Sequence, residues 1–135
     1  MEIEFMAQIK IKDETGIGKM VNELNLLINA EMLTAEELIC RRIHFEVEKY
    51  NAHKGEYFNG LIQPTDSEKI LNGYKMKEKK AIDPELQVKK ALEAFNSNGF
   101  FIITNNRQLE NLEEHILVDD NLEISFIKLV QLVGG

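Results

Sequence analysis

The sequence ends in two glycines, and the carboxylate that they carry is the group with the clearest chemical use. Gly134 and Gly135 directly follow Leu132 and Val133. Because glycine has no Cβ atom, a diglycine tail can thread a narrow channel and adopt backbone angles that other residues avoid. A carboxylate is a poor acyl donor, since its leaving group would be oxide. Acyl chemistry at Gly135 therefore needs prior activation of the carboxylate by another protein.

The residues before the diglycine predict a strand that leads into it. Leu122, Ile124 and Phe126 alternate with polar residues, which is typical of a strand with one buried face. Apolar residues then continue almost to the glycines. One strand cannot bury both faces unless each is covered, so part of this run should be exposed or bound by a partner. The candidate residues for binding a partner are Ile127, Leu129, Val130, Gln131, Leu132 and Val133.

The other reactive side chains form no catalytic or metal-binding pattern. Cys40 is the single cysteine, which leaves no basis for an intramolecular disulfide or a multi-cysteine zinc site. It flanks the apolar stripe of a predicted helix, so we expect a small core residue. His44, His53 and His115 lie in different segments and fit no catalytic triad or paired-histidine spacing. We predict no catalytic residue, no metal, no cofactor and no enzymatic activity of the chain's own.

The charge of the chain disfavours nucleic acid as a partner. The sequence has 16 Lys and Arg residues against 23 Asp and Glu residues, with a net charge of −7, and such a chain repels phosphate backbones. Lys75, Lys77, Lys79 and Lys80 form a local basic cluster. We interpret this cluster as a solvated segment, with contact to a phosphate or an acidic partner as the alternative.

The sequence also favours a cytoplasmic location. The first residues lack the basic region and uninterrupted apolar stretch of a secretory signal. No apolar run approaches the length of about 20 residues that spans a bilayer. A single cysteine fits a reducing compartment. We expect a cytoplasmic protein that does not bind membranes.

The first half of the sequence predicts a β-hairpin followed by a helix. Apolar and polar residues alternate over 3–11 and again over 24–28, with turn residues at 13–18 between them, so the two segments should form an antiparallel hairpin. Thr34 and Glu37 have the spacing of a capping box. Apolar residues at intervals of three or four then predict a helix of about five turns.

The second half predicts an insertion, a second helix and three strands. Residues 55–82 contain scattered glycines, a proline and only short apolar pairs, which we interpret as an insertion. Asp83 followed by Pro84 is typical of a helix start. After this helix, residues 100–103 predict a central strand, and the Asn-Asn pair that follows can form a tight turn to a short returning strand. The last strand leads to the diglycine.

This order of elements resembles the β-grasp, ubiquitin-like family. The resemblance is closest to the small sulfur-carrier proteins of molybdopterin and thiamin synthesis. In those proteins a short apolar strand turns at Asn-Gly, an acidic loop leads to Asp-Gly-Asp, and an apolar strand runs to a diglycine. The residues that carry the resemblance are Phe101-Ile102-Ile103-Thr104-Asn105-Asn106-Arg107-Gln108-Leu109, Leu112-Glu113-Glu114, Leu117-Val118-Asp119-Asp120-Asn121, Glu123-Ile124-Ser125-Phe126 and Gly134-Gly135.

The sequence departs from the sulfur carriers at both turns and in its tail. Asn106 stands where glycine is usual, and Asp119-Asp120-Asn121 stands for Asp-Gly-Asp. From this second turn to its end, the sequence is longer than typical sulfur carriers by two or three residues, as in ubiquitin and its bacterial relatives. It lacks the arginines of ubiquitin's own tail.

The resemblance implies a fold for the whole chain. We expect a single α+β domain of the β-grasp type over residues 1–135. It should have a mixed sheet with a helix lying across it, an insertion over about 55–82, a second helix and a tail over about 131–135.

The resemblance also implies a use for the diglycine. An adenylating enzyme of the ubiquitin-activating type would use ATP to join the Gly135 carboxylate to AMP and then pass the acyl group to a sulfur nucleophile. In a protein modifier, the acyl group is transferred to a lysine of a target protein, with a conjugating enzyme and a deconjugating peptidase as possible partners. In a sulfur carrier, Gly135 becomes a thiocarboxylate that delivers sulfur to an acceptor. The longer tail favours the modifier.

A binding module is the alternative from a different class. The chain would then be an α+β domain whose diglycine is incidental and whose apolar face recognises a partner without any covalent step.

Overall fold

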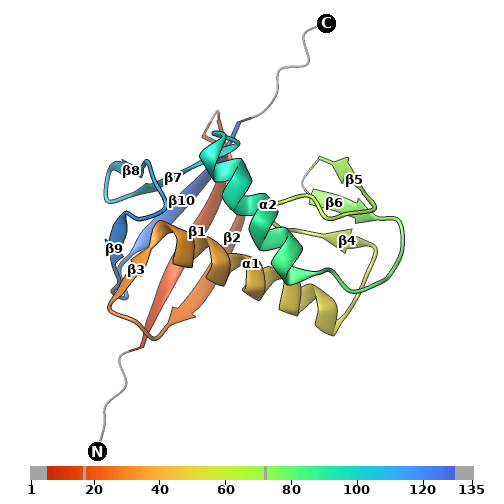
Figure 1. The fold of residues 1–135 in the computed structure, drawn as a ribbon, viewed down its shortest axis with the longest axis horizontal. Helices are drawn as coiled ribbons and strands as arrows, with labels where there is room; N and C mark the ends of the chain where they lie inside the picture. Colours follow the sequence, from red (N-terminus) through yellow and green to blue (C-terminus); the bar gives the residue numbers. More distant parts are fainter. Residues whose placement is uncertain (1–5, 17, 72, 130–135) are drawn as a thin grey trace, which may run out of the picture. The chain divides into compact units, whose positions relative to one another are not determined.

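The structure is a computed structural model that describes residues 6–16, 18–71 and 73–129. It has two helices and a mixed sheet (Figure 1), so the predicted α+β class is confirmed. The chain divides into two compact units, Met1–Glu36 with Ala94–Gly135 and Glu37–Glu93. Each unit is described by itself.

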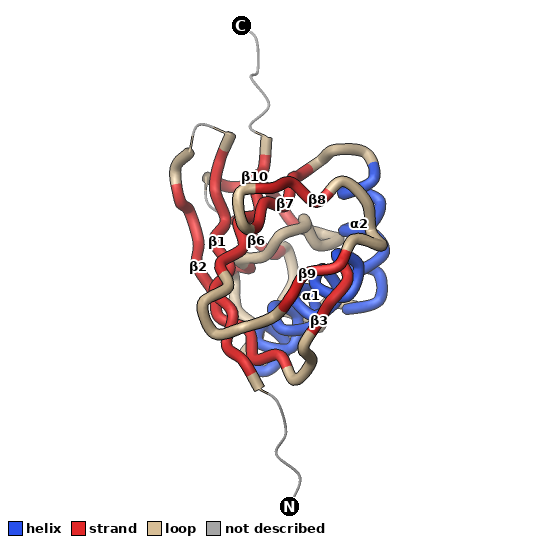
Figure 2. The backbone as a smooth tube through the Cα atoms, turned by 90° about the vertical axis from the view of Figure 1, so that its left-hand side faces the viewer, coloured by secondary structure: helices blue, strands red, loops and turns tan. Residues whose placement is uncertain are grey.

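The first unit contains a five-stranded sheet in the order β2-β1-β10-β7-β8. Figure 2 shows β2, β1, β10 and β7 side by side. The last strand, β10, runs parallel to β1 on one side and antiparallel to β7 on the other. Both β1-β2 and β7-β8 are antiparallel hairpins. The strands are β1 (Ala7–Thr15), β2 (Met20–Ile28), β7 (Phe100–Thr104), β8 (Arg107–Leu109) and β10 (Glu123–Lys128).

Alternation of apolar and polar residues places the core on one face of this sheet. In β1, Ala7, Ile9 and Ile11 are buried while the residues between them are exposed or half-buried, as the sequence pattern predicts. Asp13 continues the buried set, and its carboxylate accepts a hydrogen bond from Asn22 Nδ2 at 3.3 Å. The predicted hairpin is confirmed from Ala7 onward, and the first residues of the predicted strand lie outside the described ones.

The hairpin between β7 and β8 is closed by the predicted Asn-Asn turn. Asn105 and Asn106 have φ angles of 49° and 62°, the left-handed values that a two-residue hairpin loop requires. Asparagine tolerates these values better than most residues because its short side chain can bond locally. The prediction of a strand, a tight turn and a short returning strand is confirmed.

A second, two-stranded ribbon in the first unit was not predicted. β3 (Met32–Thr34) pairs antiparallel with β9 (His115–Leu117). Each strand has three residues, which is too short for an alternating pattern to be recognised in the sequence. The ribbon leads into the first helix, whose first amides at Ala35 and Glu36 donate to the carbonyls of Glu114 and Leu112 at 2.9 and 3.1 Å.

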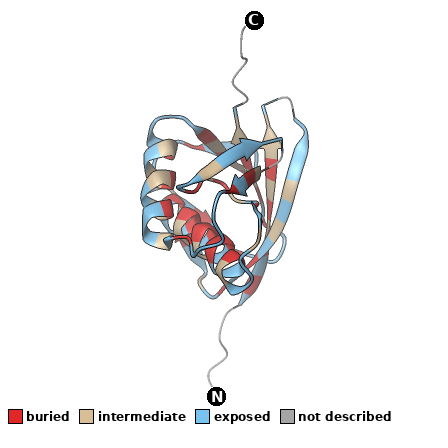
Figure 3. Cartoon of the chain, turned by 90° about the vertical axis from the view of Figure 1, so that its right-hand side faces the viewer, coloured by how far each residue is buried: buried red, intermediate tan, exposed pale blue. Residues whose placement is uncertain are grey.

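The second unit contains most of both helices and a small sheet. Helix α1 (Ala35–Ala52) has the five turns that the sequence predicts, and α2 (Pro84–Asn96) begins at the predicted proline. At this helix start, the Asp83 carboxylate accepts hydrogen bonds from the backbone N–H groups of Glu85 and Leu86 at 3.0 and 3.4 Å. Figure 3 shows that α1 has a buried side and an exposed side, as its apolar periodicity requires.

The segment predicted as an insertion forms a three-stranded antiparallel sheet in the order β4-β6-β5. The strands are β4 (Tyr57–Phe58), β5 (Ser67–Ile70) and β6 (Gly73–Met76). Asn51 of α1 ties the end of this segment to the helix, because its side chain donates to the Ile82 carbonyl at 3.0 Å and accepts from the Ile82 N–H at 2.8 Å. Gln87 of α2 donates to the Ile62 carbonyl at 3.0 Å.

A buried ion pair lies within α1, and its carboxylate also bonds the same segment. Arg42 is completely buried, and its Nε lies 2.6 Å from Oε1 of Glu46. The second carboxylate oxygen of Glu46 accepts the backbone N–H of Leu61 at 3.1 Å. A Cβ atom on Gly60 would lie only 2.3 Å from the Phe58 ring and 2.9 Å from Glu46 Oε2. Glycine is therefore needed where the insertion meets the carboxylate.

Candidate functional site

The functional site predicted from the sequence begins where β10 ends. Leu122, Ile124 and Phe126 are buried, while Glu123 is exposed and Ile127 is half-buried. This alternation fixes the faces of the strand, and pairing on both edges fixes its position between β1 and β7. A central strand with both edges paired is a rigid support for whatever follows it.

The chain leaves the sheet between the end of β1 and the start of β7. Lys128, the last residue of β10, lies opposite Thr15 in β1 and Phe100 in β7. Leu129 follows and is 56% exposed. A Cβ atom on Gly16 would lie 3.7 Å from Leu129 Cδ2, so the loop after β1 borders the exit. The expectation that part of the apolar run is exposed is confirmed at Leu129.

Beside this exit, one face of the sheet carries three half-buried apolar side chains. Phe101 in β7 lies directly opposite Ile127 in β10, and Ile103 lies opposite Ser125. Because side chains alternate along a strand, this face is opposite to the one that buries Phe126. We call the three residues Phe101, Ile103 and Ile127 the open-face strip.

Farther along β10, the same face becomes polar. Glu123 Oε2 lies 3.3 Å from Lys12 Nζ, and Lys10 Nζ lies 3.6 Å from Glu23 Oε1. These side chains are partly exposed to solvent, so the pairs add little stability. They do divide the face into an apolar part next to the exit of the chain and a charged part at the start of β10.

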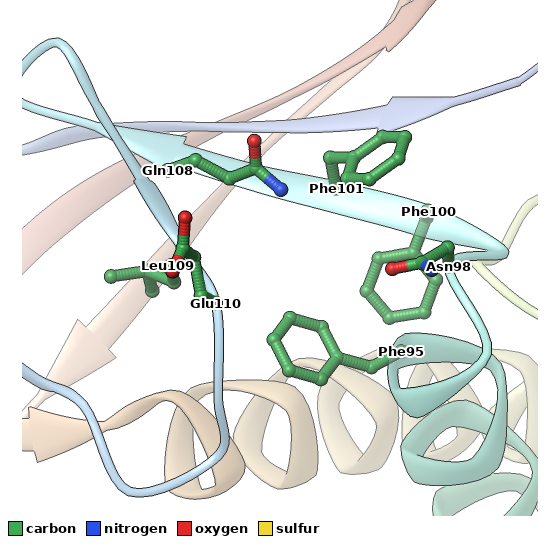
Figure 4. A pocket seen from close by; sticks show the side chains of 7 residues that line it. All are labelled: Phe95, Asn98, Phe100, Phe101, Gln108, Leu109 and Glu110. Atoms are coloured by element: carbon green, nitrogen blue, oxygen red, sulfur yellow. The ribbon is translucent and has the colours of Figure 1, made fainter.

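A cavity of about 250 Å³ lies at the edge of the sheet where β8 ends (Figure 4). The Phe95 ring from the end of α2 and the Phe100 ring from β7 have their centroids 5.9 Å apart. Phe95, Phe100 and Leu109 are buried, whereas Asn98, Gln108 and Glu110 are exposed. The three buried side chains lie beneath the cavity, and the surface that the cavity exposes is mostly polar.

The loop that follows β8 is held by a single carboxylate. Glu114 Oε2 accepts the backbone N–H groups of Glu110 and Asn111, the second at 3.1 Å, and Arg107 donates to its other oxygen at 3.1 Å. The N–H group of Glu110, then that of Asn111, and the guanidinium of Arg107 all favour the charged form, and they lower the pKa of Glu114 below the ordinary value of 4.5.

This lowered pKa predicts a pH dependence of stability. The Glu114 carboxylate stabilises the folded state at pH values above about 4.5, its ordinary pKa. This contribution is lost as the pH falls through the lowered pKa that Glu114 has in the folded state. Replacing Glu114 with glutamine should decrease the free energy of unfolding by about 0.5–1 kcal/mol near neutral pH and by much less at about pH 3. Urea unfolding at the two pH values measures the difference.

The exposed neighbour Glu113 provides the control for this prediction. Glu113→Gln should change the stability equally little at both pH values. An effect of Glu114→Gln that is as large in acid as at neutral pH would contradict the role of the carboxylate.

Most residues of the predicted site lie outside the described ones. These are Val130, Gln131, Leu132, Val133, Gly134 and Gly135. Of the candidate residues for binding a partner, the described ones are Ile127, which is half-buried, and Leu129, which is exposed.

The other reactive side chains are not gathered into a site. Cys40 is half-buried, in agreement with its interpretation as a small residue beside the core. His44 Nε2 lies 3.7 Å from a carboxylate oxygen of Glu85, and His115 belongs to β9 in the other unit. Within the described residues, His, Cys, Asp and Glu side chains form no group of three or more that could hold a metal. None of the described helices is long and apolar enough to cross a membrane.

Of the open-face strip, Ile127 was among the residues predicted to bind a partner, whereas Phe101, Ile103 and the cavity were not predicted as functional. A signal for them is present in the sequence, because Phe100, Phe101, Ile102 and Ile103 are four successive apolar residues. Such a run indicates a strand with apolar side chains on both faces. The run of apolar residues does not indicate where β8 ends. The cavity lies at that end and so could not be predicted.

Comparisons of this chain with protein-family models, with curated proteins and with solved structures found no match.

Proposed function

We propose that this chain is a β-grasp, ubiquitin-like modifier whose Gly135 carboxylate is adenylated by an activating enzyme and then transferred to an amine of a target protein. The observation that carries the proposal is the position of β10, the last strand. It lies between β1 and β7, parallel to β1, and leads directly toward the diglycine. The strand order β2-β1-β10-β7-β8 is the order expected for a β-grasp sheet with two hairpins and a central last strand.

The chemistry of activation sets what the chain must provide. A carboxylate oxygen of Gly135 attacks the α-phosphate of ATP, and pyrophosphate leaves. A thiolate of the enzyme then attacks the acyl-adenylate carbonyl, and AMP leaves. Finally an amine nitrogen attacks the thioester, the thiol leaves, and an amide is formed.

The chain must bring its carboxylate into another protein's active site while its folded part remains outside. A tail that follows a rigid central strand meets this requirement.

The open-face strip supplies the surface for docking the activating enzyme. Phe101, Ile103 and Ile127 lie beside the exit of the chain, and Leu129 is exposed next to them. Half-buried apolar side chains gain further burial when a partner covers them, and they do so without a change of fold. Docking at this position would hold the start of the tail in a fixed direction.

Substitution at this strip tests the docking surface. Ile127→Ser should weaken the affinity for the activating enzyme by about tenfold, because a half-buried apolar side chain at the interface is lost. Titration calorimetry measures the affinity. Leu117→Ser is the control, since Leu117 is 71% exposed on β9 and does not belong to the strip. Equal effects of the two substitutions would exclude the strip as the docking surface.

The proposed function is tested by chain-dependent exchange between ATP and pyrophosphate. The chain is mixed with ATP, labelled pyrophosphate and an adenylating enzyme of the ubiquitin-activating type from the same organism. Exchange that requires the chain supports activation of its carboxylate. Mass analysis of the product then distinguishes the outcomes. An amide with a lysine supports the modifier, a thiocarboxylate supports the sulfur carrier, and no exchange supports a binding module that is not conjugated.

A further inference from the structure

The outer edge of β2 is unpaired. β2 is the outermost strand on one side of the five-stranded sheet (Figure 2). Its inner edge pairs with β1 without interruption from Asn22 to Ile28, and the register shifts only beyond Asn22. The Lys10 N–H donates to the Leu122 carbonyl of β10 at 3.1 Å, so the backbone groups of Lys10 point away from β2. Asn25 lies opposite Lys10, and its backbone groups therefore point away from β1, toward the free edge.

The backbone groups along this edge are open to solvent. Glu23 and Leu27 are two residues from Asn25 on either side, so their N–H and C=O groups also point outward. All three residues are exposed, and Leu27 is 67% exposed. Among the described residues, the structure gives these outward groups no hydrogen-bond partner. They can accept another strand without any change of fold.

β2 lacks the features by which natural sheets usually protect an edge. Protected edge strands are short, carry lysine or proline, or are covered by another element. The strand at the opposite edge, β8, has three residues and carries Arg107. β2 has nine residues, none of them lysine or proline, and it exposes the side chains of Met20, Val21 and Leu27. The edge is thus a long and accessible template for a further strand.

The sequence of β2 is compatible with its own reverse, which identifies a second copy as the partner. Because outward groups bond only outward groups, an antiparallel copy can shift only in certain steps. With Leu24 opposite Leu24, a carboxylate meets an amide, since Glu23 faces Asn25 of the other copy. Two exposed apolar side chains also meet, since Leu27 faces Val21. One shift places Glu23 opposite Glu23, which is unfavourable, and the opposite shift places Glu23 against Leu27.

We propose that β2 pairs antiparallel with β2 of a second copy, with the two-fold axis at Leu24, so that one sheet continues through both copies. Glu23 of each copy exchanges its backbone hydrogen bonds with Asn25 of the other. Leu24 is half-buried, and the two copies of this leucine cover each other. One strand edge covers less surface than a stable interface needs, so the dimer is weak and depends on concentration.

The inference does not depend on the diglycine chemistry. β1 lies between β2 and β10, so pairing through β2 leaves the exit of the chain and the open-face strip uncovered.

Sedimentation equilibrium of the full chain measures the association. We expect a monomer–dimer equilibrium with a dissociation constant of about 0.1 mM. The amide resonances of Glu23 and Asn25 should shift with concentration over the same range. In a mixture of isotopically labelled and unlabelled chains, a filtered NOE spectrum should connect Leu24 Hα of one copy with Leu24 Hα of the other. The Cα atoms of such a pair lie only about 4.5 Å apart.

The substitution Asn25→Glu tests the register. Asn25 is exposed and lies opposite Lys10 in β1, so a carboxylate at this position is compatible with the fold. In the dimer it would face Glu23 of the other copy at two symmetric places, and dimerisation should weaken by about tenfold. Adding Glu23→Gln places an amide opposite the new carboxylate. The double variant should therefore dimerise as the unaltered chain does.

The substitution Leu27→Ser tests the apolar contact. It should weaken dimerisation by about tenfold, because the dimer loses a contact between Leu27 and Val21 at each end of the paired strands. Leu117→Ser is the matched control, since Leu117 is an equally exposed leucine on β9. It should leave the dissociation constant unchanged.

Four results would overturn the proposal. These are a chain that stays monomeric up to about 1 mM, no contact between the two copies of Leu24, a loss in Asn25→Glu that Glu23→Gln does not restore, and equal effects of Leu27→Ser and Leu117→Ser. A chain without Gly135 should dimerise as the complete one does, and Asn25→Glu should be adenylated at an undiminished rate. Dimerisation without adenylation, or adenylation without dimerisation, therefore separates this inference from the proposed function.

Discussion

Removal of Gly135 should lower the rate of adenylation by at least about 100-fold, because displacing a reacting group by only about 1 Å can lower a rate by about 100-fold. Deleting one residue withdraws the carboxylate by about 3.5 Å, and the new terminal carboxylate can no longer reach the nucleotide. Gly134→Ala should also slow adenylation, by about tenfold or more, since its Cβ restricts the angles that the tail can adopt. Chain-dependent exchange of pyrophosphate into ATP measures both effects.

Gly55→Ala is the matched control for these tail variants. Gly55 lies outside the tail, and the nearest atom to an added Cβ would be the His53 carbonyl oxygen at 3.9 Å, so the substitution should change neither activity nor fold. The tail variants should also unfold in urea at the same midpoint as the unaltered chain. Exchange at an undiminished rate after deletion of Gly135 would mean that the diglycine is not the reacting group.

Replacement of Glu46 with alanine should decrease the free energy of unfolding by about 3–5 kcal/mol, because it removes the carboxylate that compensates a buried guanidinium. Arg42 is completely buried and its Nε lies 2.6 Å from Glu46. The substitution also removes the acceptor of the Leu61 N–H. Burial, followed by the negative charge of Glu46, raises the pKa of Tyr74, so Tyr74 should ionise at lower pH in the variant. Urea unfolding and the pH dependence of tyrosine absorbance measure the two effects.

Two further variants define why Glu46→Ala decreases the free energy of unfolding. Glu48→Ala removes an exposed glutamate from the same helix and should change stability by less than about 0.5 kcal/mol. The double variant Arg42→Met with Glu46→Leu should recover much of the loss, since it removes both buried charges and keeps the volume. If Glu46→Ala cost less than about 1 kcal/mol, the Glu46 carboxylate would not be what stabilises Arg42 and the contact between α1 and the insertion.

The elements predicted correctly from the sequence are those with a repeated local signal. The alternation in β1 and the three-to-four spacing in α1 extend over many residues, and the start of α2 is marked by Asp83 and Pro84. Each of these signals depends on neighbours along the chain. They are therefore readable without knowledge of the rest of the fold.

The elements that were missed are short and depend on distant partners. β3 and β9 have three residues each and pair across about eighty positions of sequence. β4, β5 and β6 have two to four residues, so the insertion showed no pattern although it forms a sheet. The end of β8 at Leu109 is also hard to read from the sequence. After it, Glu114 bonds the amides of Glu110 and Asn111, and no spacing rule indicates this.

The central claim is that Gly135 is the reacting residue, and tandem mass spectrometry of the C-terminal peptide tests it most directly. The chain is incubated with ATP and an adenylating enzyme of the ubiquitin-activating type from the same organism, the products are digested, and the modified peptide is fragmented. The claim predicts that the carbonyl carbon of Gly135 carries the new bond, first to AMP or an enzyme sulfur and then to an acceptor. A C-terminal peptide that stays unmodified while the activating enzyme is demonstrably active, or a modification at any other residue, would contradict it.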